Sequence, residues 1–116
     1  MGILGKNLIL SAVDLKSEDV PVPEWGGDVR VRSLTGAERD AFDTSLLGKD
    51  GKRNLGNIRA RLLALTIVDE NGDRVFSDDD ADQLGAKSAG VLERLFEVAQ
   101  RLNGMGAAAE EEIAKN

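Results

Sequence analysis

The sequence predicts an α+β fold: an N-terminal β-hairpin, a second short hairpin, and three to four helices forming a small aliphatic core. Valines alternate on both sides of a Gly-Gly pair near residue 26, and an Asn-Gly pair follows a β-branched run near residue 71. Apolar residues recur at helical spacing in the remaining segments. The chain has 116 residues, of which 41% are apolar and 3% aromatic. We therefore expect one globular domain over residues 1–105, with a flexible acidic tail at 106–116.

The first hairpin is predicted by the segment VPEWGGDVRVR. Glycine supplies the positive φ angle that a tight turn needs, so Gly26-Gly27 marks the turn. Pro21 and Pro23 remove two backbone donors from the first arm, which predicts an edge strand. Trp25 is expected to cover the apolar face at the turn, because large aromatic side chains dominate burial in small cores. The run KNLILSAVDL before the hairpin indicates one or two helical turns.

Capping residues predict where two helices begin. Thr35 and Glu38 form a capping box, in which each side chain binds a free backbone N–H of the other. This helix should end at Gly48, with its buried face made by Ala37, Ala41, Phe42 and Leu46. Ser77 and Asp80 form a second box, and the helix that it opens should end at Gly85.

Two further helices and a loop complete the chain. Residues 48–56 combine three glycines with a charge run and predict a mobile loop. Asn54 or Asn57 caps the next helix, which buries leucines and turns Arg59 and Arg61 toward solvent. Ser88 caps the last helix, and an Asn-Gly pair at 103–104 ends it.

Composition excludes several kinds of chemistry. The sequence contains no cysteine and no histidine, so disulfides, Cys/His zinc sites and Ser-His-Asp or Cys-His catalysis are excluded. Residues 69–80 are rich in carboxylates, but an EF-hand loop needs glycine at its sixth position and glutamate at its twelfth, and neither is present. We expect no catalytic site, no metal and no cofactor.

Charge bears on the class of partner. The net charge is −6, and it is unevenly distributed: residues 49–61 carry five basic groups and one acidic group, and residues 69–82 carry one basic and seven acidic groups. An acidic chain argues against nucleic acid as the main partner. No apolar run is long enough to suggest a membrane span, so no membrane partner is expected.

The order of these signatures resembles the tail assembly chaperones of long-tailed bacteriophages and prophages. The resemblance covers roughly residues 18–105 and is carried by VPEWGGDVRVRSLTGAERDAF, then RLLALTIVDENGDRVFSDDDADQL, then VLERLFEVAQRLNGM. It implies a protein that is not an enzyme and that helps the tape measure protein and the tail tube protein assemble. Such a protein acts in the host bacterial cytoplasm and is absent from the mature virion. This chain would correspond to the shorter of two products of a ribosomal frameshift.

Three charged groups are candidates for contact with these partners. The alternative is that they are ordinary solvent-exposed side chains with no partner. They are the hairpin arginines, the acidic cap and the acidic tail, namely Arg30, Arg32, Asp78, Asp79, Asp80, Glu110, Glu111 and Glu112. Weak self-association is left open. Two other functions stay open as well: a virion head–tail connector or adaptor, and a small regulatory protein that binds an enzyme.

Overall fold

A hairpin near the N-terminus supplies most of a three-stranded antiparallel sheet with strand order β1-β2-β3. The computed structural model describes residues 2–105. Strand β1 (Ser17–Val22) pairs with β2 (Gly27–Arg32), and β2 pairs with the short β3 (Ile67–Val68). Strand β1 therefore lies at the edge of the sheet, as its prolines predicted. The α+β prediction is confirmed.

The connection between β1 and β2 is longer than a two-residue turn. A 3-10 turn, η1 (Pro23–Trp25), precedes Gly26, which has a φ of 84°. Proline fits the first position of such a turn because a backbone N–H there would have no partner, and proline has no N–H. Glycine fits the left-handed position because it has no Cβ. The indole of Trp25 is half-buried and packs against the core.

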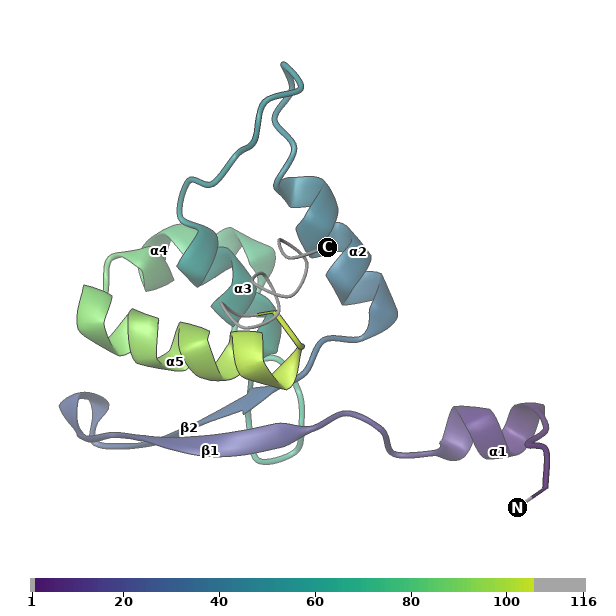
Figure 1. The fold of residues 1–116 in the computed structure, drawn as a ribbon. Helices are drawn as coiled ribbons and strands as arrows, with labels where there is room; N and C mark the ends of the chain where they lie inside the picture. Colours follow the sequence, from purple (N-terminus) through teal and green to yellow (C-terminus); the bar gives the residue numbers. More distant parts are fainter. Residues whose placement is uncertain (1, 106–116) are drawn as a thin grey trace, which may run out of the picture.

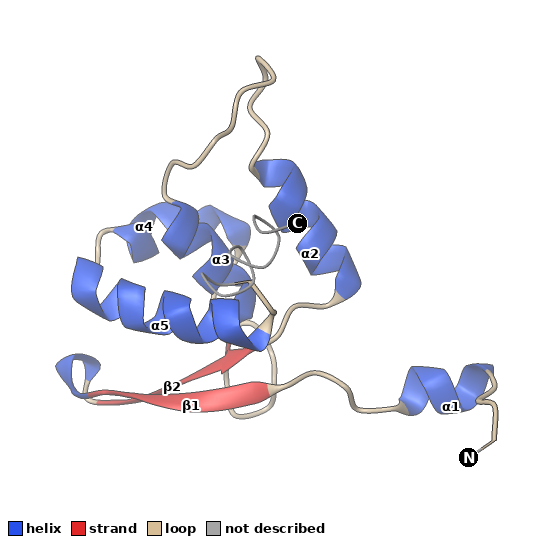
Figure 2. Cartoon of the chain, viewed as in Figure 1, coloured by secondary structure: helices blue, strands red, loops and turns tan. Residues whose placement is uncertain are grey.

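The core lies between one face of the sheet and two helices. Val20, Val22 and Val31 are buried on this face. Helices α3 (Ile58–Thr66) and α5 (Ala89–Leu102) pack against the sheet and against each other. Figure 2 shows helices α2 to α5 on one side of the strands. The remaining buried members of this aliphatic core include Leu34, Phe42, Ala60, Leu62, Leu63, Leu65, Ile67, Ala81, Leu84, Val91, Leu92, Leu95 and Ala99.

Helix α3 is the central helix of the fold. All its residues from Leu62 to Thr66 are buried, which is typical of a helix covered on every side. The hydroxyl of Thr66 donates to the carbonyl of Leu62 at 3.0 Å, so the buried polar group is satisfied within the helix. Helix α5 instead has one apolar face, which covers both α3 and the hairpin.

Helix α2 (Gly36–Ser45) begins as predicted and ends early. The hydroxyl of Thr35 accepts from the N–H of Glu38 at 3.1 Å, and the carboxylate of Glu38 accepts from the N–H of Thr35 at 2.9 Å. The helix ends at Ser45 rather than Gly48. Phe42 is its buried residue, and the prediction that Ala37 and Ala41 are also buried was wrong, because α2 contacts α3 along only part of its length.

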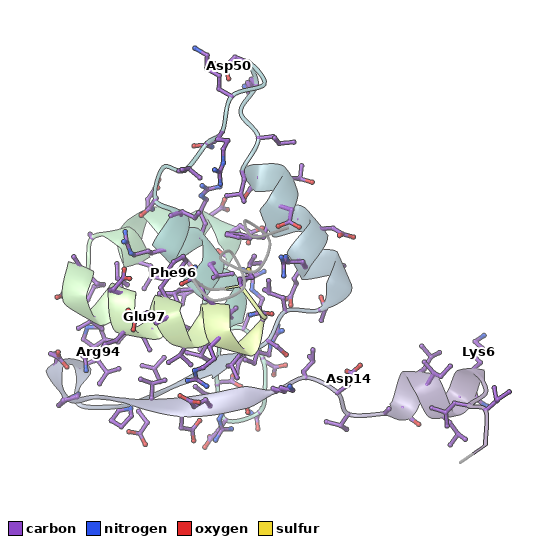
Figure 3. All side chains as sticks on the ribbon, in the orientation of Figure 1. Lys6, Asp14, Asp50, Arg94, Phe96 and Glu97 are labelled. Atoms are coloured by element: carbon purple, nitrogen blue, oxygen red, sulfur yellow. The ribbon has the colours of Figure 1, made fainter. Side chains whose placement is uncertain are left out.

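The segment between α2 and α3 extends from the body of the molecule, with Asp50 at its tip (Figures 1 and 3). Its base is tied by Arg61, whose guanidinium donates to the carbonyls of Ser45, Asn54 and Gly56 at 2.9, 2.6 and 3.0 Å. The prediction that Arg61 faces solvent was therefore wrong. These bonds satisfy carbonyls at the end of α2 and in the loop, which have no partner within a helix.

The segment from β3 to α5 contains the second hairpin and two short helical elements. The chain reverses at Asn71-Gly72, with a φ of 85° at Gly72 and a single bridge between Val68 and Arg74. Next come η2 (Asp78–Asp80) and α4 (Ala81–Gly85). Helix α5 ends at Leu102, followed by Gly104 with a φ of 66°, as the Asn-Gly pair predicted.

Helix α1 (Lys6–Ser11) lies away from the rest of the fold and contributes no buried residue (Figure 1). It forms where the sequence indicated one or two helical turns. Among the described residues, no helix has the length and apolarity needed to cross a bilayer.

Candidate partner-binding surface

Arg30, a candidate contact residue, is paired on the outer face of the sheet. It lies opposite Asp19 on β1. Its Nε donates to Asp19 Oδ1 at 2.7 Å and its Nη2 to Oδ2 at 3.1 Å. The hydrogen bond from Arg30 holds the pKa of Asp19 below its ordinary value of 3.8. The two side chains are 38% and 47% exposed, so a partner would meet a pair of opposite charges here.

Arg32, the second candidate arginine, links β2 to α2. Its Nη1 and Nη2 donate to the two carboxylate oxygens of Glu38 at 2.8 and 2.9 Å, and Nη1 also donates to the carbonyl of Ser33. The side chains are only 12% and 19% exposed. The hydrogen bond from Arg32, followed by that from the backbone of Thr35, lowers the pKa of Glu38. Arg32 is therefore much less accessible than Arg30.

The acidic cap uses two of its three carboxylates within the chain. Asp80 Oδ2 accepts from the N–H of Ser77 at 2.8 Å, as the capping box predicted. Asp78 Oδ1 accepts from Arg74 Nη2 at 2.9 Å. Within residues 2–105, no hydrogen bond or ion pair involves the side chain of Asp79, which is exposed. Of the three aspartates, Asp79 is therefore the one most available to a partner.

The remaining candidates and the overall charge pattern can be placed only in part. Glu110, Glu111 and Glu112 lie outside the described residues. Across residues 2–105, no hydrogen bond joins the side chain of either candidate arginine to the acidic cap. In the same part of the chain, no three acidic side chains gather as metal ligands would.

A hollow beside β2, which we name the Trp25 groove, was not predicted. It arises because β3 is short and pairs only with Arg30 and Val31, so the first half of β2 borders a depression. Trp25 also lines a second, adjoining hollow, where the ammonium of Lys87 lies 6.0 Å from the ring centroid. The groove has apolar walls and a charged, mainly acidic rim. It is lined by Trp25, Val29, Ile67, Val68, Val75 and Phe76 and by Asp19, Asp28, Arg30, Asp69 and Glu70.

A second unpredicted feature is an exposed apolar segment, residues 2–15, which we name the N-terminal arm. It includes α1 and extends away from the body, as Lys6 and Asp14 show in Figure 3. The apolar run itself was visible in the sequence, but its exposure was not. Its large apolar side chains, all exposed, are Ile3, Leu4, Leu8, Ile9, Leu10, Val13 and Leu15.

Comparison with known proteins identifies the family. The family model described as phage tail assembly chaperone matches residues 5–116. The chain belongs to this family. The resemblance noted over residues 18–105 is thereby confirmed and extended toward both ends of the chain.

A solved structure agrees with this assignment. The tail assembly chaperone of bacteriophage HK97 is 27% identical in sequence and superposes with a TM-score of 0.59, covering 76% of this chain and 85% of that one. A search of curated protein sequences gave no match. The role of a tail assembly chaperone is non-enzymatic.

The described surface of this tail assembly chaperone offers means of binding another protein. Ion pairs such as Arg30–Asp19 supply charges of both signs, which steer association and favour particular partners. The Trp25 groove and the N-terminal arm supply apolar area, which provides most of the free energy of protein association. Charged and apolar contact surfaces therefore occur on the same small domain.

Proposed function

We propose that this chaperone binds the tape measure protein and the tail tube protein during tail assembly. Binding is reversible and involves no chemical turnover. The observation that carries the proposal is the family match over residues 5–116, because it places the chain among proteins that assist tail assembly. The chaperone acts in the host bacterial cytoplasm and leaves before the virion is complete.

The surface supports a contact that includes charged side chains. Arg30 and Asp19 are both partly exposed, and Asp79 is exposed in η2, just before α4. Interactions between exposed charges are screened within about 8 Å at physiological ionic strength. We therefore expect affinity for the tape measure protein to fall clearly between 50 mM and 500 mM salt.

The test is co-expression with the tape measure protein encoded in the same genome. The chaperone should increase the soluble fraction of that protein and co-purify with it, and a soluble acidic protein of similar size serves as the control. The same assay with the tail tube protein tests the second partner. Purified virions, analysed by mass spectrometry, should lack the chaperone.

The outcomes separate the chaperone from the head–tail connector. Equal aggregation of the tape measure protein with and without the chain would contradict the proposal. Stoichiometric amounts of the chain in purified virions would support a connector instead. Co-purification that resists 500 mM salt would contradict the expected charged contact but not the binding itself.

A further inference from the structure

The Trp25 groove begins where β3 stops. Strand β3 pairs with only two residues of β2, so residues 27–29 have no strand on that side. The N–H of Ser33 donates to the carbonyl of Lys16, in continuation of the register between β2 and β1. Because the backbone groups of an antiparallel strand point to alternate sides, those of Asp28 point away from β1 and toward the groove.

The backbone of Asp28 is available to another protein. Among residues 2–105, no backbone group bonds to its N–H or its carbonyl, and the residue is exposed. Free groups of this kind on a strand recruit an extended segment, which adds main-chain hydrogen bonds to the sheet. Only one residue offers them here, so the segment that pairs with it is short and depends on its side chains as well.

The two faces of the sheet beside Asp28 differ in chemistry. Val29 packs toward the core on the helix side, together with the half-buried Trp25 and Phe76. Asp28 and Arg30, at the alternate positions of β2, face outward. The charged residues that line the groove are four acids and one base, so its charge is net negative. A segment in the groove therefore meets apolar side chains on one face and carboxylates on the other.

An extended segment matches this division, since its own side chains point alternately to the two faces. A residue directly opposite Asp28 has its side chain on the same outward face, where lysine or arginine would be attracted by Asp28 and Glu70. Its neighbours in the segment face Trp25, so they should be apolar. A helix meets neither condition, because its backbone groups are bonded internally and its faces repeat every 3.6 residues.

We infer that the Trp25 groove binds an extended segment of a tail protein in which apolar residues alternate with basic ones. The segment lies antiparallel to β2, as β3 does. The inference rests on the proposed function for the class of partner, whereas the chemistry of the segment follows from the groove. The binding of such a segment can therefore be tested on the purified chain without any tail protein.

The first experiment uses the fluorescence of Trp25, the single tryptophan of the chain, to detect binding in the groove. The probe is an acetylated peptide amide in which four valines alternate with four lysines. Titration of the purified chain with this probe should shift the emission of Trp25 to shorter wavelength, because the peptide excludes water from the indole. A peptide with glutamate in place of lysine should give no shift. A peptide of the same composition with valines at helical spacing should give none either.

Two modified probes test the backbone contact. The residue opposite Asp28 would be a lysine of the probe, whose N–H and carbonyl point toward β2 in an antiparallel pair. N-methylation of the lysines should therefore abolish the shift in emission. N-methylation of the valines should leave it, because their backbone groups point away from β2.

Four variants test the side chains. Val75→Glu places a charge in the apolar wall, where Val75 is 50% exposed, and should abolish binding of the probe. Leu47→Glu, at a side chain 66% exposed outside the groove, should bind as the natural chain does. Glu70→Lys should weaken binding severalfold, and Asp40→Lys, at an exposed residue of α2, should not. Should Val75→Glu lose its native circular dichroism, Glu70→Lys and the modified probes still test the groove.

Co-expression with the tape measure protein and with the tail tube protein separates this inference from the proposed function. Val75→Glu should lose co-purification with one of them, and Leu47→Glu should keep it. If Val75→Glu keeps both partners, the groove is not the site, although the proposed function stands. If the natural chain retains neither partner, the proposed function fails and with it the class of partner, while the peptide titrations decide whether the groove binds.

Three further results would overturn the inference. The first is an unchanged emission of Trp25 with the valine–lysine probe, or an equal shift with the valine–glutamate peptide. The second is equal binding of the two N-methylated probes, which would exclude pairing with Asp28. The third is a change in the mass of the purified chain on Val75→Glu, measured by light scattering, which would show that a second copy occupies the groove.

Discussion

The side-chain oxygen of Asn103 accepts a hydrogen bond from the backbone N–H of Leu34, 69 positions earlier in the chain, at 2.7 Å. Its side-chain nitrogen donates to the carbonyl of Ala99 at 2.7 Å. Asn103 thus joins the end of α5 to the segment that follows the hairpin. One amide satisfies a backbone donor and a backbone acceptor that are both partly buried.

Replacing this amide should destabilise the fold. Asn103→Ala leaves the N–H of Leu34 without its acceptor, which costs about 1–3 kcal/mol for a buried donor. Urea denaturation followed by circular dichroism measures the change. Arg101→Ala is the control, because Arg101 pairs with Glu18 on the exposed surface, where solvent screens the pair and its contribution to stability is small. Equal stability of Asn103→Ala and the natural chain would contradict this role.

The pair Arg32–Glu38 should make stability depend on pH in the acid range. The pKa of Glu38 is lower in the folded chain than its ordinary value of 4.5, so the pair stabilises the fold fully above that value. The contribution is lost as the pH falls through the lower, folded pKa. Glu38→Gln should therefore be less stable than the natural chain at pH 7, and the gap should close toward pH 3 in urea titrations.

A more exposed ion pair provides the control for this pH series. Arg39 and Asp43 are 43% and 55% exposed and lie four positions apart on α2. Asp43→Asn should change stability by less than about 0.5 kcal/mol at every pH, because solvent screens such pairs. A gap for Glu38→Gln that stays constant from pH 7 to pH 3 would show that the effect of Glu38 is not electrostatic.

Arg61 should determine how easily the loop opens to proteases. The loop at residues 48–56 is exposed and rich in glycine, so trypsin should cut first at Lys49, Lys52 or Arg53. Arg61→Ala removes the bonds to Asn54 and Gly56 and should speed this cleavage severalfold. Mass spectrometry identifies the first products.

The neighbouring Arg59 is the matched control for this cleavage. It pairs with Glu93 and lies over the ring of Phe96 at 5.7 Å, away from the loop. Arg59→Ala should leave the initial cleavage rate unchanged. First cleavage at Arg94 or Arg101 would instead show that α5 opens before the loop does.

Two aspartates of the acidic cap should have different roles: Asp80 stabilises the fold, and Asp79 is accessible to a partner. Asp80→Ala removes the bond to the N–H of Ser77 and should cost about 0.5–2 kcal/mol, as the loss of a cap does. Asp79→Ala should leave the melting temperature unchanged and weaken binding of the tape measure protein. Asp40→Ala, at another exposed helical aspartate, is the control for binding. Unchanged affinity for Asp79→Ala would remove this residue from the candidates.

The fold should require glycine at position 85, because the side chain of Asn57 occupies the space that a Cβ there would need. Asn57 has a φ of 55°, and its amide nitrogen donates to the carbonyl of Ala81 at 3.0 Å. A Cβ on Gly85 would overlap the side-chain amide of Asn57, which is held by its bond to Ala81. Gly85→Ala should therefore cost about 1–3 kcal/mol, as overpacking does. Asn57→Gly frees the space and accepts the positive φ, so the double variant should be more stable than Gly85→Ala alone.

Many parts of the fold that depend on neighbours in sequence were predictable, although Asn57 and Ser88, which were expected to cap helices, make no side-chain capping bond. Capping boxes and glycine turns act over two to four positions, so Thr35–Glu38, Ser77–Asp80 and the turn at Gly72 could be recognised directly. The edge position of β1 also followed from a local property, the missing N–H of proline.

Features that depend on distant parts of the chain were not predictable from the sequence. The pairing of β3 with β2 joins Ile67 to Val31, and no residue type marks that choice. Arg61 resembles any solvated arginine until the loop folds back onto it. The apolar run of the arm indicated a helix, but whether a helix is buried depends on where the rest of the chain lies.

The proline of the edge strand, Pro21, also affects how this protein behaves at high concentration. An edge strand with free N–H and C=O groups can recruit strands from other chains and lead to aggregation. Strand β1 lacks one donor at Pro21 and carries the carboxylates of Glu18 and Asp19. Both features oppose growth of the sheet beyond β1. A tail assembly chaperone with this edge strand can therefore contact another protein through its side chains without becoming part of an extended β-structure.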